Sequence, residues 1–161
     1  MIAAASDFAN LLRQTLARRY RPSERRPEMA RPNRVSCLAR IEPSAVPLLA
    51  ESLTAAGQPA PVFVRQLAVT ELGLLAPGVL ILDLDGLETD PLEMLRMLRF
   101  VLPACMIAVY TNVLEEPWAL ACHMAGANCL LSKASDAEQV TLGLRGSLQR
   151  GCYTDPSFTA A

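Results

Sequence analysis

Three polar side chains are placed where they could together handle a phosphoryl group. Asp83, Thr111 and Lys133 each come directly after an apolar run of four or five residues, and Lys133 is the only lysine of the chain. Runs of this length between helical patterns are typical of buried parallel strands, whose carboxyl ends meet at one edge of an open sheet. An acid, a hydroxyl and an ammonium would there supply a nucleophile, a contact to a phosphoryl oxygen and a neutralising charge.

An alternation of strand and helix patterns positions these residues. Proline and glycine end most of the segments, and Asp90 and Ser135, each with a glutamate three residues later, indicate capping boxes at two helix starts. We expect strands at 35–39, 62–64, 79–82, 106–110 and 128–131, and helices at 44–56, 70–75, 91–100, 117–125 and from 136 onward. Five such units predict an α/β fold with a five-stranded, doubly wound parallel sheet of flavodoxin-like type.

Composition and charge divide the chain of 161 residues into an extension and a body. Residues 1–33 hold an amphipathic helix at 7–19 and a linker rich in proline and arginine, and residues 34–155 form the predicted domain, with 156–161 as a tail. Up to residue 34 the net charge is +5, whereas the remainder carries −6. No apolar run is long enough to span a bilayer or to act as a signal peptide, so we expect a cytoplasmic protein.

The five cysteines show no spacing typical of a zinc site. Cys37, Cys105, Cys122, Cys129 and Cys152 form neither a CxxC nor a CxxH pair. An isolated cysteine usually behaves as a small hydrophobic residue, so buried thiols are the simpler expectation.

The order of these motifs resembles the receiver domain of two-component response regulators. Asp83 in LILDLDG corresponds to the phosphoryl-accepting aspartate of that family, Thr111 in IAVYT to its conserved hydroxyl, and Lys133 in AGANCLLSK to its conserved lysine. The closing segment from Lys133 to Pro156 is similar to receivers that precede a LuxR-type DNA-binding domain, which has no room in this chain. The resemblance implies a CheY-like fold and a role in bacterial signalling or phosphorelay.

The same alignment places two unexpected residues where receivers carry Mg²⁺-binding acids. Arg40 and Ile41 stand at those positions, while Leu130 replaces an aromatic and Ala134 a proline. Without the two carboxylates Mg²⁺ loses most of its oxygen ligands. We therefore expect a pseudo-receiver without a cofactor, in which the Arg40 guanidinium takes the place of the cation and pairs with Asp83.

Two other functions stay open. One is an intact receiver that accepts a phosphoryl group on Asp83 with Mg²⁺. The other is a phosphatase of haloacid-dehalogenase type, because LILDLDG also resembles its first motif, with Asp83 as nucleophile, Asp85 as general acid and base, and both as metal ligands. A simpler role for Asp83 and Asp85 is to cap the loop that follows the strand.

The function that these observations favour is a non-enzymatic module acting through protein contacts. The resemblance implies a histidine kinase, a response regulator or another regulator as partner, or a second copy of the chain, bound through a surface at residues 116–150. Because the extension is rich in arginine, nucleic acid is a second, less favoured type of partner. No contact with a membrane is expected.

Overall fold

A computed structural model describes residues 35–158. The chain divides into two units, Met1–Arg31 and Pro32–Ala161, and everything described here belongs to the second. The predicted helix at 7–19, the linker after it and the last three residues lie outside the described residues. The domain boundaries expected at 33 and 155 therefore stay predictions.

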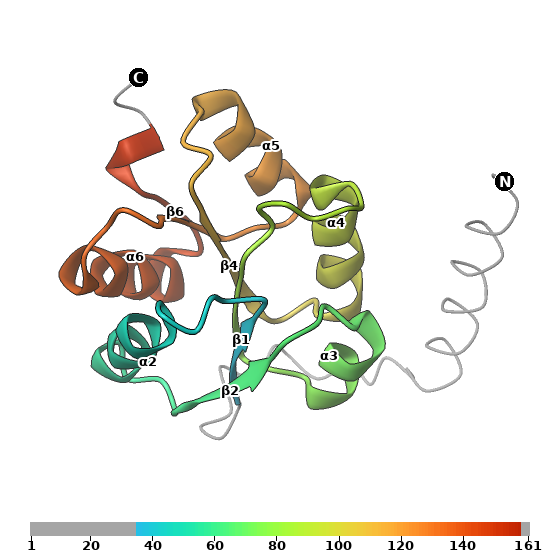
Figure 1. Ribbon diagram of the computed structural model, residues 1–161, viewed down its shortest axis with the longest axis horizontal. Helices are drawn as coiled ribbons and strands as arrows, with labels where there is room; N and C mark the ends of the chain where they lie inside the picture. The colour runs from blue at the N-terminus through green and yellow to red at the C-terminus, as the bar shows by residue number, and fades with distance from the viewer. Residues whose placement is uncertain (1–34, 159–161) are drawn as a thin grey trace, which may run out of the picture. The chain divides into compact units, whose positions relative to one another are not determined.

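Strands and helices alternate along the described chain (Figure 1). The elements are β1 (Ser36–Ala39), α2 (Val46–Ala55), β2 (Pro61–Val64), α3 (Val69–Leu75), β3 (Val79–Leu82), α4 (Pro91–Val101), β4 (Met106–Thr111), α5 (Glu116–Ala125), β5 (Cys129–Ser132), α6 (Ala137–Arg150), β6 (Tyr153–Thr154) and the 3₁₀ helix η1 (Pro156–Phe158). All strand pairs are parallel, in the order β2-β1-β3-β4-β5-β6. The predicted α/β class is confirmed, but the sheet has six strands rather than the expected five.

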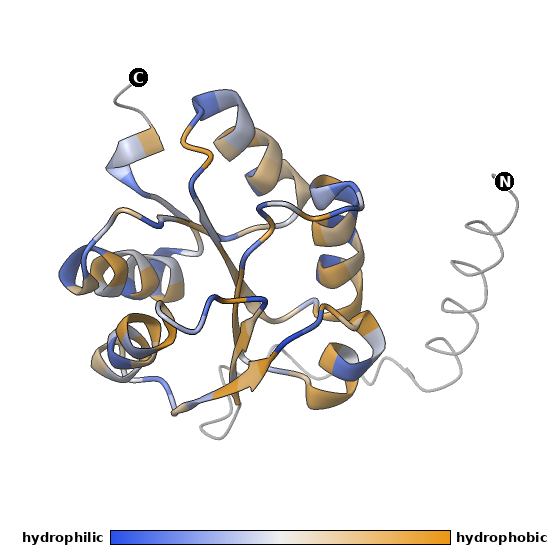
Figure 2. Ribbon diagram, in the orientation of Figure 1, coloured by the Kyte–Doolittle hydropathy of each residue, from blue (hydrophilic) through white to orange (hydrophobic). Residues whose placement is uncertain are grey.

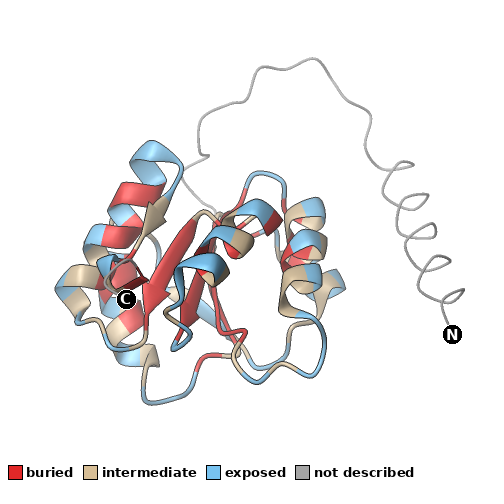
Figure 3. Ribbon diagram, turned by 90° about the horizontal axis from the view of Figure 1, so that it is seen from above, coloured by how far each residue is buried: buried red, intermediate tan, exposed pale blue. Residues whose placement is uncertain are grey.

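Helices cover both faces of the sheet, which explains why its central strands are mostly apolar (Figure 2). Helices α2 and α6 pack on one face and α3, α4 and α5 on the other (Figure 1). Every residue of β1, β3, β4 and β5 is buried, so the sheet forms the centre of the molecule (Figure 3). Strands buried on both sides are typical of parallel sheets in α/β proteins.

Strand register brings the carboxyl ends of the central strands to one edge. Ala39 at the end of β1 pairs with Leu82 at the end of β3, and Thr111 at the end of β4 pairs with Ser132 at the end of β5. In open parallel sheets, ligands bind at this edge. The residues that follow these four strands are therefore neighbours in space, as the sequence predicts.

One of the two predicted helix caps is correct. The Asp90 carboxylate accepts a hydrogen bond from the main-chain N–H of Leu92 at the start of α4. Helix α6 is capped by Asp136, which accepts from the N–H of Gln139, and not by Ser135 as predicted. The Ser135 hydroxyl instead donates to the buried carboxylate of Asp155.

The unexpected sixth strand lies beside β5. Strand β6 has only two residues, and side chains on both neighbouring helices hold it: His123 on α5 contacts the Thr154 hydroxyl, and Gln139 on α6 donates to the Tyr153 hydroxyl. Phe158, just beyond it, is fully buried and belongs to the core cluster on the face of the sheet that α3, α4 and α5 cover. The chain after α6 thus covers an edge of the sheet that the predicted five-stranded fold leaves open.

Two further sequence expectations can be compared with the described residues. Four cysteines are buried, as expected, and burial raises the pKa of the Cys37 thiol to about 11 and that of Cys122 and Cys129 to about 12. Cys152 is exposed. Among residues 35–158 no helix has the length and apolar character required to cross a membrane.

Candidate functional site

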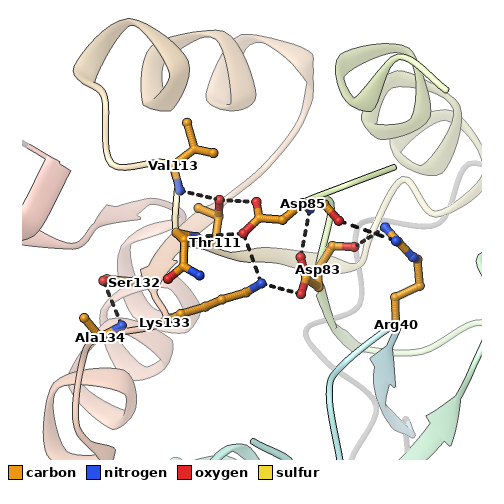
Figure 4. Close-up of polar contacts among 9 residues, drawn as sticks. Arg40, Asp83, Asp85, Thr111, Val113, Ser132, Lys133 and Ala134 are labelled. Carbon is orange, nitrogen blue, oxygen red and sulfur yellow. Dashed lines mark hydrogen bonds and ion pairs between the residues drawn. The ribbon is translucent and has the colours of Figure 1, made fainter. Parts of the chain in front are cut away.

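The three residues singled out by the sequence meet at the predicted edge (Figure 4). The Lys133 ammonium lies 2.6 Å from Asp83 Oδ2 and 3.0 Å from Asp85 Oδ2, so it bridges both carboxylates. Asp83 is buried, whereas the side chains of Lys133 and Asp85 are about one fifth exposed. The site is thus a partly enclosed charge cluster, in which one cation faces two anions.

Asp85 is the centre of this cluster, which the sequence did not predict. Its Oδ1 accepts a hydrogen bond from the Thr111 hydroxyl at 2.5 Å, and its Oδ2 accepts one from the main-chain N–H of Asn112 at 2.8 Å. Its own N–H donates to Asp83 Oδ1 at 2.8 Å. From the sequence we expected Asp85 either to cap the loop after its strand or to act as the general acid and base of a phosphatase. Neither role includes these hydrogen bonds to the end of β4. Thr111 contacts Asp85 rather than Asp83.

These contacts determine the charge of the groups at neutral pH. Burial by itself would raise the pKa of the Asp85 carboxyl, but the hydrogen bonds from Thr111, Asn112 and Lys133 and the positive charge of Lys133 outweigh it and lower that pKa. Burial would lower the pKa of the Lys133 ammonium, but its bonds to Asp83 and Asp85 raise it. Lys133 and Asp85 are therefore both charged at pH 7.

Arg40 reaches the same cluster but makes different contacts from those predicted. Its guanidinium donates to the main-chain carbonyl of Asp83 at 3.1 Å and to that of Asp85 at 3.4 Å. The expected pairing with the Asp83 carboxylate is wrong, because Lys133 already occupies that carboxylate. Arg40 directly follows β1, and its N–H bonds the carbonyl of Val64 on β2. With φ at 56° it lies in the left-handed region, which is costly for a residue with a Cβ.

The residues present offer Mg²⁺ a poor set of ligands. Ile41, at the second position where receivers carry an acid, is buried and apolar. Within residues 35–158, no group of three or more His, Cys, Asp or Glu side chains is arranged to hold a metal ion. The main-chain carbonyl oxygens of Asp83 and Asp85 accept hydrogen bonds from the cationic guanidinium of Arg40. Mg²⁺ requires close to six oxygen ligands in octahedral geometry, which these residues do not supply.

A small open cavity lies next to the cluster. It has a volume of about 360 Å³, and its walls include Asp83, Asn112, Lys133 and, from the start of α2, Ala45. Solvent and small ions in this cavity can therefore contact the Lys133 side chain, which is 20% exposed.

Comparison with known proteins rests on structure alone, because no protein-family model and no curated relative matches this sequence. The RcsB response regulator of Salmonella typhimurium superposes with a TM-score of 0.65 at 19% identity, over 79% of this chain and 64% of that one. The NtrC4 receiver domain, described as a beryllofluoride-activated dimer, superposes with a TM-score of 0.61 at 20% identity, over 71% of this chain and 95% of that one.

The chain has the fold of a response-regulator receiver domain. Its likeness extends to a protein of Burkholderia pseudomallei described as related to pilus assembly, with a TM-score of 0.58 at 18% identity, over 80% of this chain and 98% of that one. Identities this low show the fold and no more. The receiver fold also supports proteins named for different functions, so the function must be argued from the site.

Proposed function

We propose that this protein is a receiver-like signalling module that acts through protein contacts without being phosphorylated. The observation that carries the proposal is Arg40, which stands where a receiver would carry an acid and donates to the main-chain carbonyls of Asp83 and Asp85. Phosphoryl transfer relies on cations that offset the charge of the transferring group. At Asp83 the metal lacks its ligands, and Lys133 is already bound by two carboxylates.

The surface proposed for the partner is the outward side of α5, within the predicted range 116–150. Leu120 and Met124, one turn apart on α5, are 61% and 81% exposed. The edge of β5, which belongs to the same predicted surface, is covered by β6. The partner classes are a histidine kinase, a response regulator, a second copy of the chain or, in view of the fold neighbour named for pilus assembly, an assembly protein.

Two expectations from the sequence belong to this proposal. A cytoplasmic location fits a signalling role. The lesser alternative of nucleic-acid binding depends on the arginine-rich extension, which lies outside the described residues.

Incubation with acetyl phosphate and Mg²⁺, followed by intact mass measurement, tests the proposal. We expect no mass increase for the wild-type protein under conditions that label a known receiver completely. A gain of one phosphoryl group that Asp83→Asn abolishes would show an intact receiver instead. Hydrolysis of a generic phosphomonoester that Asp85→Asn abolishes would support the phosphatase alternative, although Asp85 is engaged by Thr111, Asn112 and Lys133.

A further inference from the structure

Three hydrogen-bond donors of different kinds converge on the carboxylate of Asp85. Two are the Thr111 hydroxyl and the Lys133 ammonium, which lie on either side of the Asp85 carboxylate (Figure 4). The third is the main-chain N–H of Asn112. Such donors are also those that bind phosphate or sulfate in proteins. We infer that they form an oxyanion site and that the Asp85 carboxylate is its resident occupant, filling the place that a phosphoryl group would otherwise take.

The pattern of contacts distinguishes Asp85 from an ordinary capping residue. Asp90 and Asp136 each accept a main-chain N–H from the first turn of the helix that they begin. The donors to Asp85 instead come from the end of β4 and the segments after β4 and β5, and Asp85 itself follows β3. Its carboxylate therefore joins the ends of three strands, which is what an anion bound at this edge would do.

The resident carboxylate also fixes the chain that leads into α5. Thr111 Oγ1 donates a hydrogen bond to Asp85 and accepts one from the main-chain N–H of Val113 at 3.0 Å. Because both bonds share this oxygen, the position of the Asp85 carboxylate also orients the main chain at Val113. This inference rests on the proposed function and deepens it: Asp85 holds the β4–α5 segment in a single state, so no phosphoryl group is needed to reach that state.

The site is accessible to a small anion once the carboxylate is removed. The neighbouring cavity of about 360 Å³ is bordered by Asn112 and Lys133, two of the three residues that supply donors. In Asp85→Ala the Thr111 hydroxyl and the Asn112 N–H lose this acceptor, and the Lys133 ammonium keeps only Asp83. Unsatisfied donors at a partly buried site are costly. Inorganic phosphate entering through the cavity would satisfy them again.

The test is anion rescue of the chain of residues 1–161. Thermal unfolding of wild type, Asp85→Ala and Asp90→Ala is measured in chloride and in inorganic phosphate at equal ionic strength and pH 7. Asp90→Ala is the matched control, because it also removes a carboxylate that accepts a main-chain N–H but leaves the oxyanion site filled. We expect phosphate to raise the melting temperature of Asp85→Ala with a saturable dose response. At ten times its Kd, phosphate should increase the folding equilibrium constant about elevenfold.

Wild type and Asp90→Ala should respond equally and weakly to phosphate, and adding Lys133→Met to Asp85→Ala should remove the rescue. Equal shifts in all three proteins, or no saturable shift in Asp85→Ala, would overturn the assignment. If Asp85→Ala does not fold in chloride, Asp85→Ser is used under the same criteria, since its hydroxyl is too short to replace the carboxylate. Acetyl phosphate labelling of the wild type would overturn the proposed function but not the rescue, so the two can fail separately.

Discussion

Replacing Lys133 by methionine should destabilise the fold strongly at neutral pH. Methionine keeps an apolar side chain of similar length but removes the cation that lies 2.6 Å from Asp83 and 3.0 Å from Asp85. Breaking a buried pair by removing one partner costs about 3 to 5 kcal/mol. The Asp83 side chain is only 9% exposed, but Asp85 is 23% exposed and can recover some hydration, so we expect the lower end, about 3 kcal/mol.

The cost of this substitution should shrink as the pH falls. In the wild type the lowered pKa of Asp85 stabilises the fold above the ordinary carboxyl range, and this stabilisation is lost only as the pH drops through that lowered value. In Lys133→Met the two neighbouring carboxylates have no cation, which favours protonation, so the variant regains stability as it is acidified. The difference in unfolding free energy between the two proteins should therefore be smaller at pH 4 than at pH 7.

Urea unfolding followed by the fluorescence of Trp118, the single tryptophan, measures both effects. Arg96→Met is the matched control, because it breaks an ion pair with Glu93 in which both side chains are more than half exposed, and it should cost less than about 0.5 kcal/mol. A cost for Lys133→Met as small as that of the control, or one that does not change between pH 7 and pH 4, would refute the view that Lys133 compensates both carboxylates.

Three further predictions concern other parts of the chain. Arg40→Ala and Arg40→Gly both remove the two hydrogen bonds from the guanidinium to main-chain carbonyls. In urea unfolding the glycine variant should be more stable than the alanine variant by about 1 kcal/mol, because glycine adopts the left-handed backbone conformation of this position at little cost. Equal stabilities of the two variants would argue against backbone strain at position 40. Phe158→Ala should lower the unfolding free energy by about 3 to 5 kcal/mol, and a loss below about 1 kcal/mol would mean that the segment after α6 does not pack as described. Deleting residues 1–33 should leave a domain that is folded by circular dichroism. The deletion should weaken self-association, measured by light scattering, or partner binding, measured in a binding assay at low salt. An unchanged mass and an unchanged affinity would show that the extension is passive.

The sequence predicted the features that depend on long, regular patterns. Apolar runs located the five principal strands, and the polar residues that follow three of these runs placed Asp83, Thr111 and Lys133 at one edge. Parallel topology alone brings such residues together, so their proximity could be foreseen. The detailed pairing of these side chains could not be foreseen, because Asp83 and Asp85 both follow β3. Which of the two Thr111 contacts depends on side-chain positions that no local sequence pattern determines.

Contacts between distant segments were missed for the same reason. Arg99 on α4 donates to the carbonyls of Gly126 and Cys105 and to the Asn128 side chain, so it ties α4 to the turn before β5. No local pattern distinguishes this arginine from the exposed Arg96 one turn earlier. The only sequence signal for this contact of Arg99 is Gly126, whose positive φ and close approach to the Arg99 side chain leave no room for a Cβ. Strand β6 is too short to show a strand period.

The most direct test of the account is an amide NMR titration of the wild-type protein with beryllofluoride and Mg²⁺, the phosphoryl mimic that activates the NtrC4 receiver. We expect no change in the amide signals of Asn112 and Val113, because the Asp85 carboxylate already occupies their side of the site and Mg²⁺ lacks its ligands. A saturable shift of these signals that Asp83→Asn abolishes would show that Asp83 accepts a phosphoryl group, and would contradict the account.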